Sequence, residues 1–428
     1  MARGSLIYAL FLDYGMERVY NIKIQQKDVM RVKFSSKMEA CGLSPMRKFN
    51  PYAVETEKRG VKIYHLNIGQ PDIITPDAYY QALRDFSEPV LAYAPAGGLP
   101  ALLDAVRGYY EKLGVKLERK HILSTTGGSE ALQMVMACLL DDGDEIIIPE
   151  PFYPNYHTSV TLAGGKIRPL TTCPEEDYRY AVRERVEACI NERTRAILVT
   201  NPGNPTGSVL TPEELRLMLD IAKEYGLFII CDEVYREFTY GGEPLLSALQ
   251  YEGYEENVIV IDSVSKRFSA CGARVGMLIS KNEAFMGQAM KWCQCRLCAS
   301  TINQVAAAEL YTVGSDYFDA VREEYKRRRD AMLAKLRAIS GVVCAEPKGA
   351  FYVMAALPID DADKFQLWLL NEFNDHGETL MYAPGAPFYA TPGKGKNEVR
   401  MAYVLSATEL ERAMDILAVA IEQYNAGR

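Results

Sequence analysis

The sequence lacks a surplus of basic residues and has no long basic run. It contains 48 Lys and Arg against 56 Asp and Glu, which gives a net charge of −8. This balance argues against nucleic acid and acidic membrane surfaces as partners. A small carboxylate substrate is still compatible with it, because one or two well-placed arginines can bind a carboxylate whatever the net charge.

A membrane-length apolar run is also missing. The apolar stretch "LIYALFL" near the start is seven residues long and runs into Asp13, so it is typical of neither a signal peptide nor a membrane span. We expect residues 1–37 to form an N-terminal extension, which is either an extra arm or the result of translation upstream of Met30 or Met38. Ten irregularly spaced cysteines without an export signal predict reduced thiols in a cytoplasmic protein.

Histidine, a common metal ligand, is scarce. The four histidines are His65, His121, His157 and His376, and the tightest cysteine group, "CQCRLC" at 293–298, has no fourth ligand nearby. We therefore predict no metal site and interpret these cysteines as ordinary thiols.

Short apolar runs alternate with helical patterns through the middle of the chain. One predicted helix follows Thr211 as its N-cap, with Pro212 and Glu214 in the first turn. The apolar runs are continuous, which indicates strands covered on both faces and predicts an α/β fold with a mainly parallel sheet. The predicted strands are 145–149, 195–200, 227–231, 257–261 and 274–280.

The pattern changes near residue 315, where a long charged helix begins. Short strands and a last amphipathic helix follow it, which is typical of a smaller α+β domain. At about 150 residues per domain, a chain of 428 residues predicts two or three units. We expect a small domain of residues 38–70 and 315–428 and a large domain of residues 71–314.

Polar residues follow three of the predicted strands, and ligands of open α/β sheets bind at such strand ends. Asn204 lies in "NPGNPTG" after 195–200, where it serves either a ligand or a rigid turn. Asp232, with Tyr235 three residues later, follows 227–231, and a carboxylate there either caps a turn or meets a buried cation such as a protonated ring nitrogen. Lys266 lies in "DSVSKRFSACGARVG" after 257–261, and by itself it is most simply a surface charge.

A glycine-rich turn precedes another predicted helix, in "STTGGSEAL". Free backbone N–H groups at a helix start favour a phosphate, although an ordinary capped helix would look the same.

Eight segments, in order, carry a resemblance to a known family. They are "LNIGQPD", "YAPAGGLPALLDAV", "TTGGSEAL", "PEPFYPNY", "NPGNPTG", "CDEVY", "SVSKRFSACGARVG" and "NEVRMAYV". From about Leu66 to near the C-terminus, the chain resembles the pyridoxal-phosphate-dependent aminotransferases of class I/II, the aspartate aminotransferase family of fold type I. The resemblance implies a large domain with a mainly parallel sheet wrapped by helices, a smaller α+β domain, and a homodimer with shared active sites.

The resemblance also implies roles for individual residues. Lys266 matches the lysine that forms the internal aldimine with the cofactor and carries the α-proton, Asp232 pairs with the pyridinium nitrogen, and Tyr235 tunes the aldimine through the ring's phenolic oxygen. The other implied cofactor contacts are Asn204 to the phenolic oxygen, Tyr153 over the ring face, Ser263, Arg274, Gly128 and Ser129 at the phosphate, and Tyr93 from the other subunit. The implied substrate contacts are Arg400 to the α-carboxylate, with Asn204 beside it, and Gly69 in the segment that closes over the same group.

The reaction implied is a ping-pong transfer of an amino group from an L-amino acid, with aspartate as first choice, to a 2-oxo acid such as 2-oxoglutarate. Alanine, aromatic or broad-range transamination, a carbon–sulfur lyase of the same fold, and a non-catalytic sensor domain remain alternatives. Arg296, Arg47 and Lys48 are candidates for binding a side-chain carboxylate, and each is equally well interpreted as a solvated charge. Ala273 stands where many relatives carry a tryptophan, which indicates a different pocket wall.

Overall fold

The computed structural model describes residues 33–241 and 245–427. Its largest element is a seven-stranded sheet in the order β2-β8-β7-β6-β5-β3-β4. All neighbouring strands pair in parallel except β8, which is antiparallel to both β2 and β7. The strands are β2 (Ile122–Thr125), β3 (Glu145–Glu150), β4 (Lys166–Thr171), β5 (Thr194–Thr200), β6 (Phe228–Asp232), β7 (Val258–Ser263) and β8 (Gly276–Ile279).

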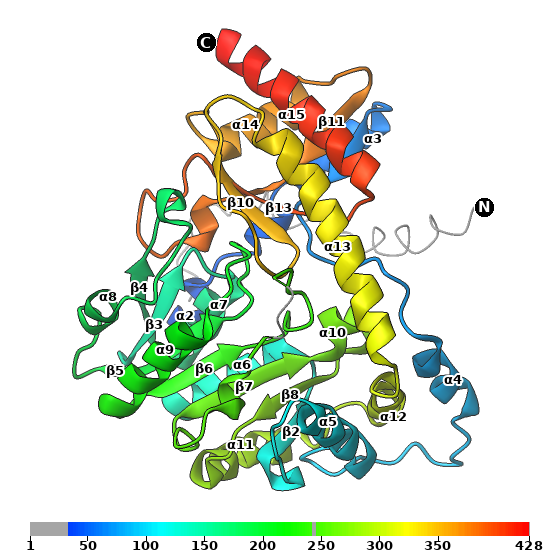
Figure 1. The fold of residues 1–428 in the computed structure, drawn as a ribbon, viewed down its shortest axis with the longest axis vertical. Helices are drawn as coiled ribbons and strands as arrows, with labels where there is room; N and C mark the ends of the chain where they lie inside the picture. The colour runs from blue at the N-terminus through cyan, green and yellow to red at the C-terminus, as the bar shows by residue number, and fades with distance from the viewer. Residues whose placement is uncertain (1–32, 242–244, 428) are drawn as a thin grey trace, which may run out of the picture.

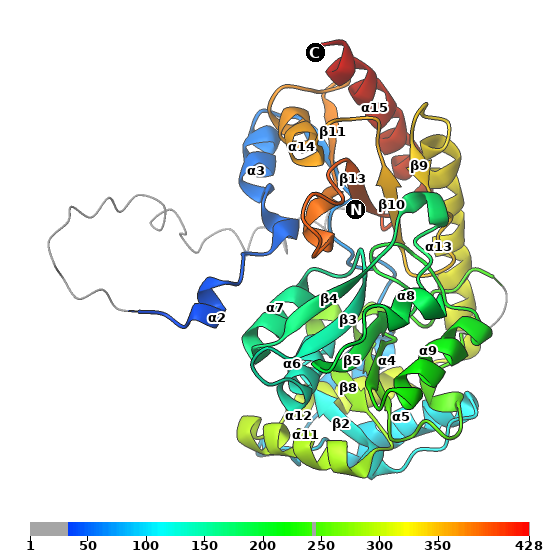
Figure 2. The same ribbon diagram turned by 90° about the vertical axis from the view of Figure 1, so that its left-hand side faces the viewer.

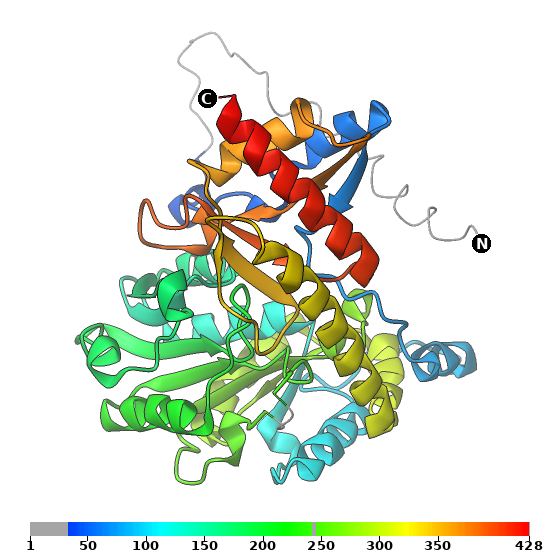
Figure 3. The same cartoon turned by 45° about the horizontal axis from the view of Figure 1, so that its top comes forward.

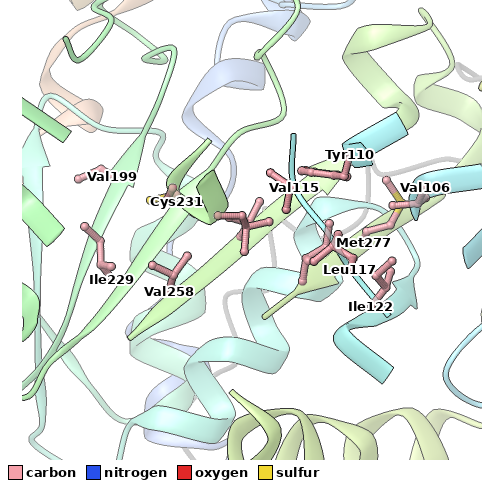
Figure 4. Close-up of a cluster of buried hydrophobic side chains, with 14 of the residues drawn as sticks. Val106, Tyr110, Val115, Leu117, Ile122, Val199, Ile229, Cys231, Val258 and Met277 are labelled. Atoms are coloured by element: carbon pink, nitrogen blue, oxygen red, sulfur yellow. The ribbon is translucent and has the colours of Figure 1, made fainter. Parts of the chain in front are cut away.

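Helices cover both faces of this sheet, as the continuous apolar runs predicted. Successive residues of each strand point to opposite faces, so Ile229 packs in one apolar cluster and Ile230 in another. The first cluster includes α5 (Pro100–Lys112), α9 (Pro212–Glu224) and α12 (Thr301–Leu310), and the second includes α6 (Gly128–Leu139), α7 (Asn155–Ala163) and α11 (Glu283–Arg296). Figure 2 shows α7 and α9 on opposite sides of the sheet, and Figure 4 shows Val199, Ile229 and Val258 of adjacent strands in the first cluster.

The predicted strand and helix limits agree closely with the structure. The capping box predicted for α9 is present, because the Thr211 side chain accepts from the Glu214 N–H and the Glu214 side chain accepts from the Thr211 N–H. The fifth predicted strand is shorter than expected, since β8 begins at Gly276 and not at residue 274. The α/β fold class with a mainly parallel sheet is therefore confirmed.

Two smaller sheets lie above the large sheet in Figure 1. One is antiparallel with the order β12-β13-β10-β9, and the other pairs β1 with β11 in parallel. Their strands are β1 (Lys62–His65), β9 (Val343–Cys344), β10 (Tyr352–Ala356), β11 (Glu378–Met381), β12 (Ala383–Pro384) and β13 (Glu398–Ala402). Pairing of β1 with β11 brings the segment before residue 70 to the C-terminal elements; the domain limits themselves stay a prediction.

Three long helices pack on the smaller sheets. They are α13 (Ser315–Leu336), α14 (Ala362–Asn371) and α15 (Ala407–Ala426), and they share an apolar core with β10, β11 and β13. Figure 3 shows α13 and α15 crossing the same face. The remaining α-helices of the described residues are α2 (Ser36–Glu39), α3 (Asn50–Lys58), α4 (Asp77–Asp85), α8 (Arg183–Glu187) and α10 (Val264–Arg267).

The predicted N-terminal extension, residues 1–37, lies mostly outside the described residues. In the described residues, no helix is both long and apolar enough to cross a membrane.

Candidate active site

The candidate site lies where β5, β6 and β7 end together. Thr200, the last residue of β5, is paired with Asp232, the last residue of β6. β7 lies on the other side of β6 and ends at Ser263, so α10 with Lys266 follows at the same edge. The polar strand ends predicted from the sequence therefore meet in space, as the carboxyl ends of parallel strands do.

Asp232 is a buried carboxylate that has no cationic partner among the described residues. Its Oδ2 accepts a 2.6 Å hydrogen bond from the Tyr156 hydroxyl, and its Oδ1 accepts from the Val234 N–H at 3.3 Å. Burial raises the pKa of Asp232 to about 6. Across residues 33–241 and 245–427 it forms no ion pair within 4.0 Å, so the carboxylate is suited to a protonated nitrogen supplied by a ligand.

A chain of hydrogen bonds joins the loop after β5 to the turn after β6. The Asn204 Nδ2 donates to the Tyr235 hydroxyl at 3.3 Å, and the Arg400 Nη1 donates to the Asn204 Oδ1 at 3.1 Å. Burial raises the pKa of Tyr235 well above its usual value, so the phenol keeps its proton at neutral pH. The large sheet and β13 of the small sheet are thus connected through one asparagine.

Arg400 is a buried guanidinium that has no carboxylate partner within the part of the chain that the structure describes. Its side chain is 2% exposed, and its Nη2 donates to the Asn67 carbonyl at 2.5 Å. Neither its Nε nor the Asn67 Oδ1 has a hydrogen-bond partner, and Arg400 forms no ion pair in the described part of the chain. A buried cation with a free donor fits an anionic ligand such as a carboxylate.

Lys266 lies in the short helix α10 and is half-buried. Ser263 caps this helix, because its hydroxyl accepts from the Ser265 N–H at 3.1 Å. The Lys266 Nζ donates to the Gly69 carbonyl at 2.8 Å and lies 3.8 Å from the Cys271 Sγ. The amine therefore lies between the end of β7 and the segment before α4, and it forms no ion pair among the described residues.

A cradle of backbone and arginine lies at the start of α6. Gly127 has a φ of 77°, and a Cβ there would overlap the guanidinium of Arg274. Arg274 donates to the carbonyls of Cys271 at 2.9 Å and Thr126 at 3.3 Å, which holds its guanidinium beside the helix start. Gly128 is the first helical residue and Ser129 the second, so free N–H groups and a cation face the same space, as a phosphate requires.

Comparison with known proteins decides the family. The profile of "Aminotransferase class I and II" matches residues 61–417, well over half of the chain. The chain belongs to this family. A relative from Musicola paradisiaca, named aspartate aminotransferase, is 31% identical over 92% of this chain and 97% of its own length.

Solved structures agree with this assignment. The chain is similar to a single mutant of the Thermus thermophilus aspartate aminotransferase, with a TM-score of 0.83 and 28% identity over 91% of this chain and 100% of that one. It is equally similar to an alanine aminotransferase from Pyrococcus furiosus, with a TM-score of 0.83 and 30% identity over the same shares of the two chains. The protein is thus a pyridoxal-phosphate-dependent aminotransferase of fold type I.

The residues of this aminotransferase fit the cofactor of the family. A carboxylate with no cation suits the pyridine nitrogen, an amine without an ion pair suits the aldehyde, and the Gly127–Arg274 cradle suits the phosphate. The Ser263 hydroxyl donates to the Val275 carbonyl at 3.0 Å, which places it beside the segment that carries Arg274. The ring nitrogen, the aldehyde and the phosphate of the cofactor would therefore each find a chemically matched partner.

Two predicted cofactor residues, Tyr153 and Tyr93, differ in their exposure to solvent. Tyr153 is half-buried, and burial raises its pKa, with Lys266 and Arg400 among the neighbouring charges that oppose this effect. Tyr93 is 78% exposed on the surface of the single chain. Its predicted contact with the cofactor of the other subunit stays a prediction.

Two of the three candidate specificity cations are already paired within the chain. Arg296 forms an ion pair of 2.6 Å with Glu130 and donates to the carbonyls of Ala96 and Ser124. Lys48 forms an ion pair of 2.9 Å with Asp363. Arg47 is exposed, directly after Met46, whose carbonyl accepts from the Asn67 side chain at 3.2 Å.

Sequence reasoning missed three tyrosine and cysteine contacts of this site. Tyr156 was inside a recognised segment, "PEPFYPNY", but only the structure shows its hydroxyl on Asp232. Cys271, beside the Lys266 amine, was inside another. Tyr352 lies 2.9 Å from the Tyr235 hydroxyl at the start of a buried strand, where no polar strand-end pattern marked it.

Proposed function

We propose that the protein transfers the amino group of an L-amino acid, with aspartate as the favoured donor, to a 2-oxo acid such as 2-oxoglutarate by a ping-pong mechanism. The observation that carries this proposal is the buried Arg400 guanidinium, which has a free Nε and no carboxylate partner among the described residues. An α-carboxylate is common to amino acids and 2-oxo acids, so one arginine serves both halves of the reaction.

Bound pyridoxal phosphate supplies an aldehyde that condenses with amines and a ring that accepts the electrons left when the α-proton departs. Asp232 keeps the ring nitrogen protonated, because a carboxylate buried without a cation is stabilised by that proton. Tyr235 and Asn204 donate to the phenolic oxygen, while Arg274, Ser263 and the N–H groups of Gly128 and Ser129 hold the phosphate. Tyr153 packs against the ring.

Lys266 holds the cofactor and moves the proton. A lysine serves here because its Nζ can lose its proton and then accept another, which an arginine cannot do. Its hydrogen bond to the Gly69 carbonyl holds the amine next to the segment that we expect to close over the substrate carboxylate. Closure of this segment excludes water while the proton is carried.

The aspartate preference rests on the names of the relatives and on Arg47, the one candidate cation for which no ion pair is described. Alanine transamination is the second candidate. The pairing of Arg296 with Glu130 and of Lys48 with Asp363 favours it, because both cations are occupied. The alanine aminotransferase among the similar structures supports the same choice.

We further propose a homodimer in which Tyr93 reaches the cofactor phosphate of the other subunit. Val90, Leu91 and Tyr93 are consecutive or nearly so and are all well exposed in the single chain, as interface residues would be. A cytoplasmic location stays a prediction from the cysteine pattern.

A half-reaction screen tests the donor. Purified cofactor-bound protein is mixed with aspartate, alanine, glutamate and aromatic amino acids in turn, and loss of the yellow cofactor absorbance is followed. Conversion fastest with aspartate supports the first choice, and conversion fastest with alanine supports the second. Failure to convert any amino acid contradicts the proposal, and pyruvate with ammonia formed without a 2-oxo acid acceptor indicates a lyase.

A further inference from the structure

Tyr352 closes a ring of contacts that the sequence did not reveal. It is the first residue of β10, is 2% exposed, and pairs in register with Ala402 of β13, two residues beyond Arg400. Its hydroxyl lies 2.9 Å from that of Tyr235, and the Arg400 guanidinium lies over its ring at 4.5 Å from the centroid. Since Asn204 already joins Tyr235 to Arg400, these four side chains form a closed ring.

The same tyrosine also lies against the segment that holds Lys266. A Cβ on Gly69 would overlap both the hydroxyl and the ring of Tyr352, so the backbone passes directly over this side chain. That segment accepts the Lys266 Nζ at the Gly69 carbonyl and an Arg400 N–H at the Asn67 carbonyl. Tyr352 therefore contacts both Arg400 and the Gly69 segment, two of the parts that we propose to hold the substrate carboxylate.

We propose that Tyr352 is a positioning residue with two separable roles. Its ring face supports the Arg400 guanidinium, through a cation–π contact that is strong when both groups are buried. Its hydroxyl hydrogen-bonds the phenol of Tyr235. This inference rests on the proposed function, because it assigns Tyr235 to the phenolic oxygen of the cofactor and Arg400 to the substrate.

The Tyr352 hydroxyl should strengthen the hydrogen bond that Tyr235 donates to the cofactor. When the Tyr235 hydroxyl donates a hydrogen bond to the cofactor, its single proton is used, so its oxygen accepts from Asn204 and the Tyr352 hydroxyl must act as the donor of the bond between the two phenols. A phenol that accepts hydrogen bonds is a stronger donor, because successive hydrogen bonds polarise one another. Loss of the Tyr352 hydroxyl therefore weakens the Tyr235 hydrogen bond to the cofactor's phenolic oxygen and makes the bound chromophore harder to deprotonate.

The test compares two substitutions in the cofactor-bound protein. Tyr352→Phe keeps the ring and removes the hydroxyl, so the pH midpoint of the cofactor's absorbance change should rise by roughly half a unit to one unit. Binding of succinate, an unreactive dicarboxylic acid, should change less than about twofold, because the ring still supports Arg400. Tyr352→Leu removes the ring as well, so succinate binding should weaken by roughly 3- to 30-fold.

A matched control comes from the same domain. Tyr382 is fully buried and donates to the Ala362 carbonyl at 2.9 Å, so Tyr382→Phe also removes one buried hydroxyl. This variant should leave both the pH midpoint and succinate binding as in the unsubstituted protein. A midpoint in Tyr352→Phe equal to that of the Tyr382→Phe control would overturn the hydroxyl role, and unchanged succinate binding in Tyr352→Leu would overturn the ring role.

Gly69 offers an independent measurement. Gly69→Ala should weaken succinate binding in the protein that keeps Tyr352, because the added Cβ would overlap the tyrosine ring. In the Tyr352→Leu variant the same substitution should have little further effect. Equal effects in both backgrounds would contradict the proposed contact. These readouts are spectra and binding, so they separate this inference from the proposed reaction, which is tested by the products formed from each amino acid.

Discussion

At the scale of single residues, the position of Asp232 disfavours the ionised form of its own carboxyl group. A carboxylate that follows three buried strand residues loses its hydration, and burial raises its pKa from 3.8 to about 6. Two hydrogen bonds, from Tyr156 and Val234, oppose this effect only in part. The cost is expected at a site that must bind a cationic ring nitrogen, because that ligand completes the pairing.

This cost gives a pH dependence with a definite sign. Between about pH 4 and pH 6 the folded protein keeps the Asp232 proton while the unfolded chain has lost it, so this group makes the free energy of unfolding fall as pH rises. In the cofactor-free protein, Asp232→Asn should therefore become more stable relative to the unsubstituted protein by roughly 1 to 2 kcal/mol between about pH 5 and pH 8. Urea unfolding at the two pH values measures this difference, and a gap that stays constant or shrinks would argue against it.

At the scale of elements, a buried ion pair fixes α10 on β7. The Arg267 Nη2 donates to both oxygens of Asp262 at 2.8 Å, and both side chains are fully buried. The Tyr110 hydroxyl donates to Asp262 at 3.0 Å, and the guanidinium lies over the Tyr109 ring at 4.1 Å. Because Asp262 precedes Ser263 and Arg267 follows Lys266, this pair holds the two proposed cofactor residues between its members.

Removing one charge of that pair should destabilise the protein more than removing both charges. Arg267→Met leaves the buried Asp262 charge without its cationic partner and should lower the free energy of unfolding by about 3 to 5 kcal/mol. Adding Asp262→Asn to it should recover a large part of the loss. Lys335→Met, which removes one member of an exposed ion pair with Asp415, serves as the control and should cost less than about 1 kcal/mol. Denaturant midpoints of the four proteins check the result, and a double variant no more stable than Arg267→Met would refute this account.

The sequence predicts elements whose signal is local. Each buried parallel strand carries a continuous apolar run, so β3, β5, β6 and β7 were found within about two residues of their observed limits. β4 lies at the sheet edge with alternating exposure and was missed. The antiparallel direction of β8 and the pairing of β1 with β11 depend on partners distant in the sequence, which no local pattern encodes.

Local sequence signals also reveal some residues of the site and leave others hidden. Asp232 was predicted because a carboxylate directly after an apolar run is costly to bury without a cation, and because ligands of open α/β sheets bind at strand ends. Lys266 alone was indistinguishable from a surface charge, and only the ordered family segments gave it a role. Tyr156 and Tyr352 are apolar in pattern and acquire their polar contacts only through the tertiary fold.

At the scale of the whole molecule, the proposed homodimer makes each site depend on two subunits. The exposed Tyr93 would contribute to the partner's cofactor site, whereas Arg274 serves its own. Subunits with Lys266→Ala and subunits with Tyr93→Ala should each be weakly active at limiting cofactor. A mixed dimer of the two keeps one site with both native residues, so co-expression under two affinity tags should restore activity above either parent.

A second mixed dimer gives the control. Lys266 and Arg274 belong to the same subunit's site, so a dimer of Lys266→Ala and Arg274→Ala subunits contains no fully native site and should stay inactive. Equal recovery in the two mixtures would count against a shared site. A single-chain mass by sedimentation would rule out the dimer outright.

The central claim is that Lys266 is the amine that holds pyridoxal phosphate, and chemical trapping tests it most directly. Borohydride converts a cofactor bound to a lysine into a stable adduct, which peptide mass spectrometry can locate. We predict the adduct on the peptide that contains Lys266, with loss of both adduct and yellow absorbance in Lys266→Arg, which keeps the charge but cannot lose its proton. An adduct on another lysine, or yellow absorbance that survives in Lys266→Arg, would contradict the account.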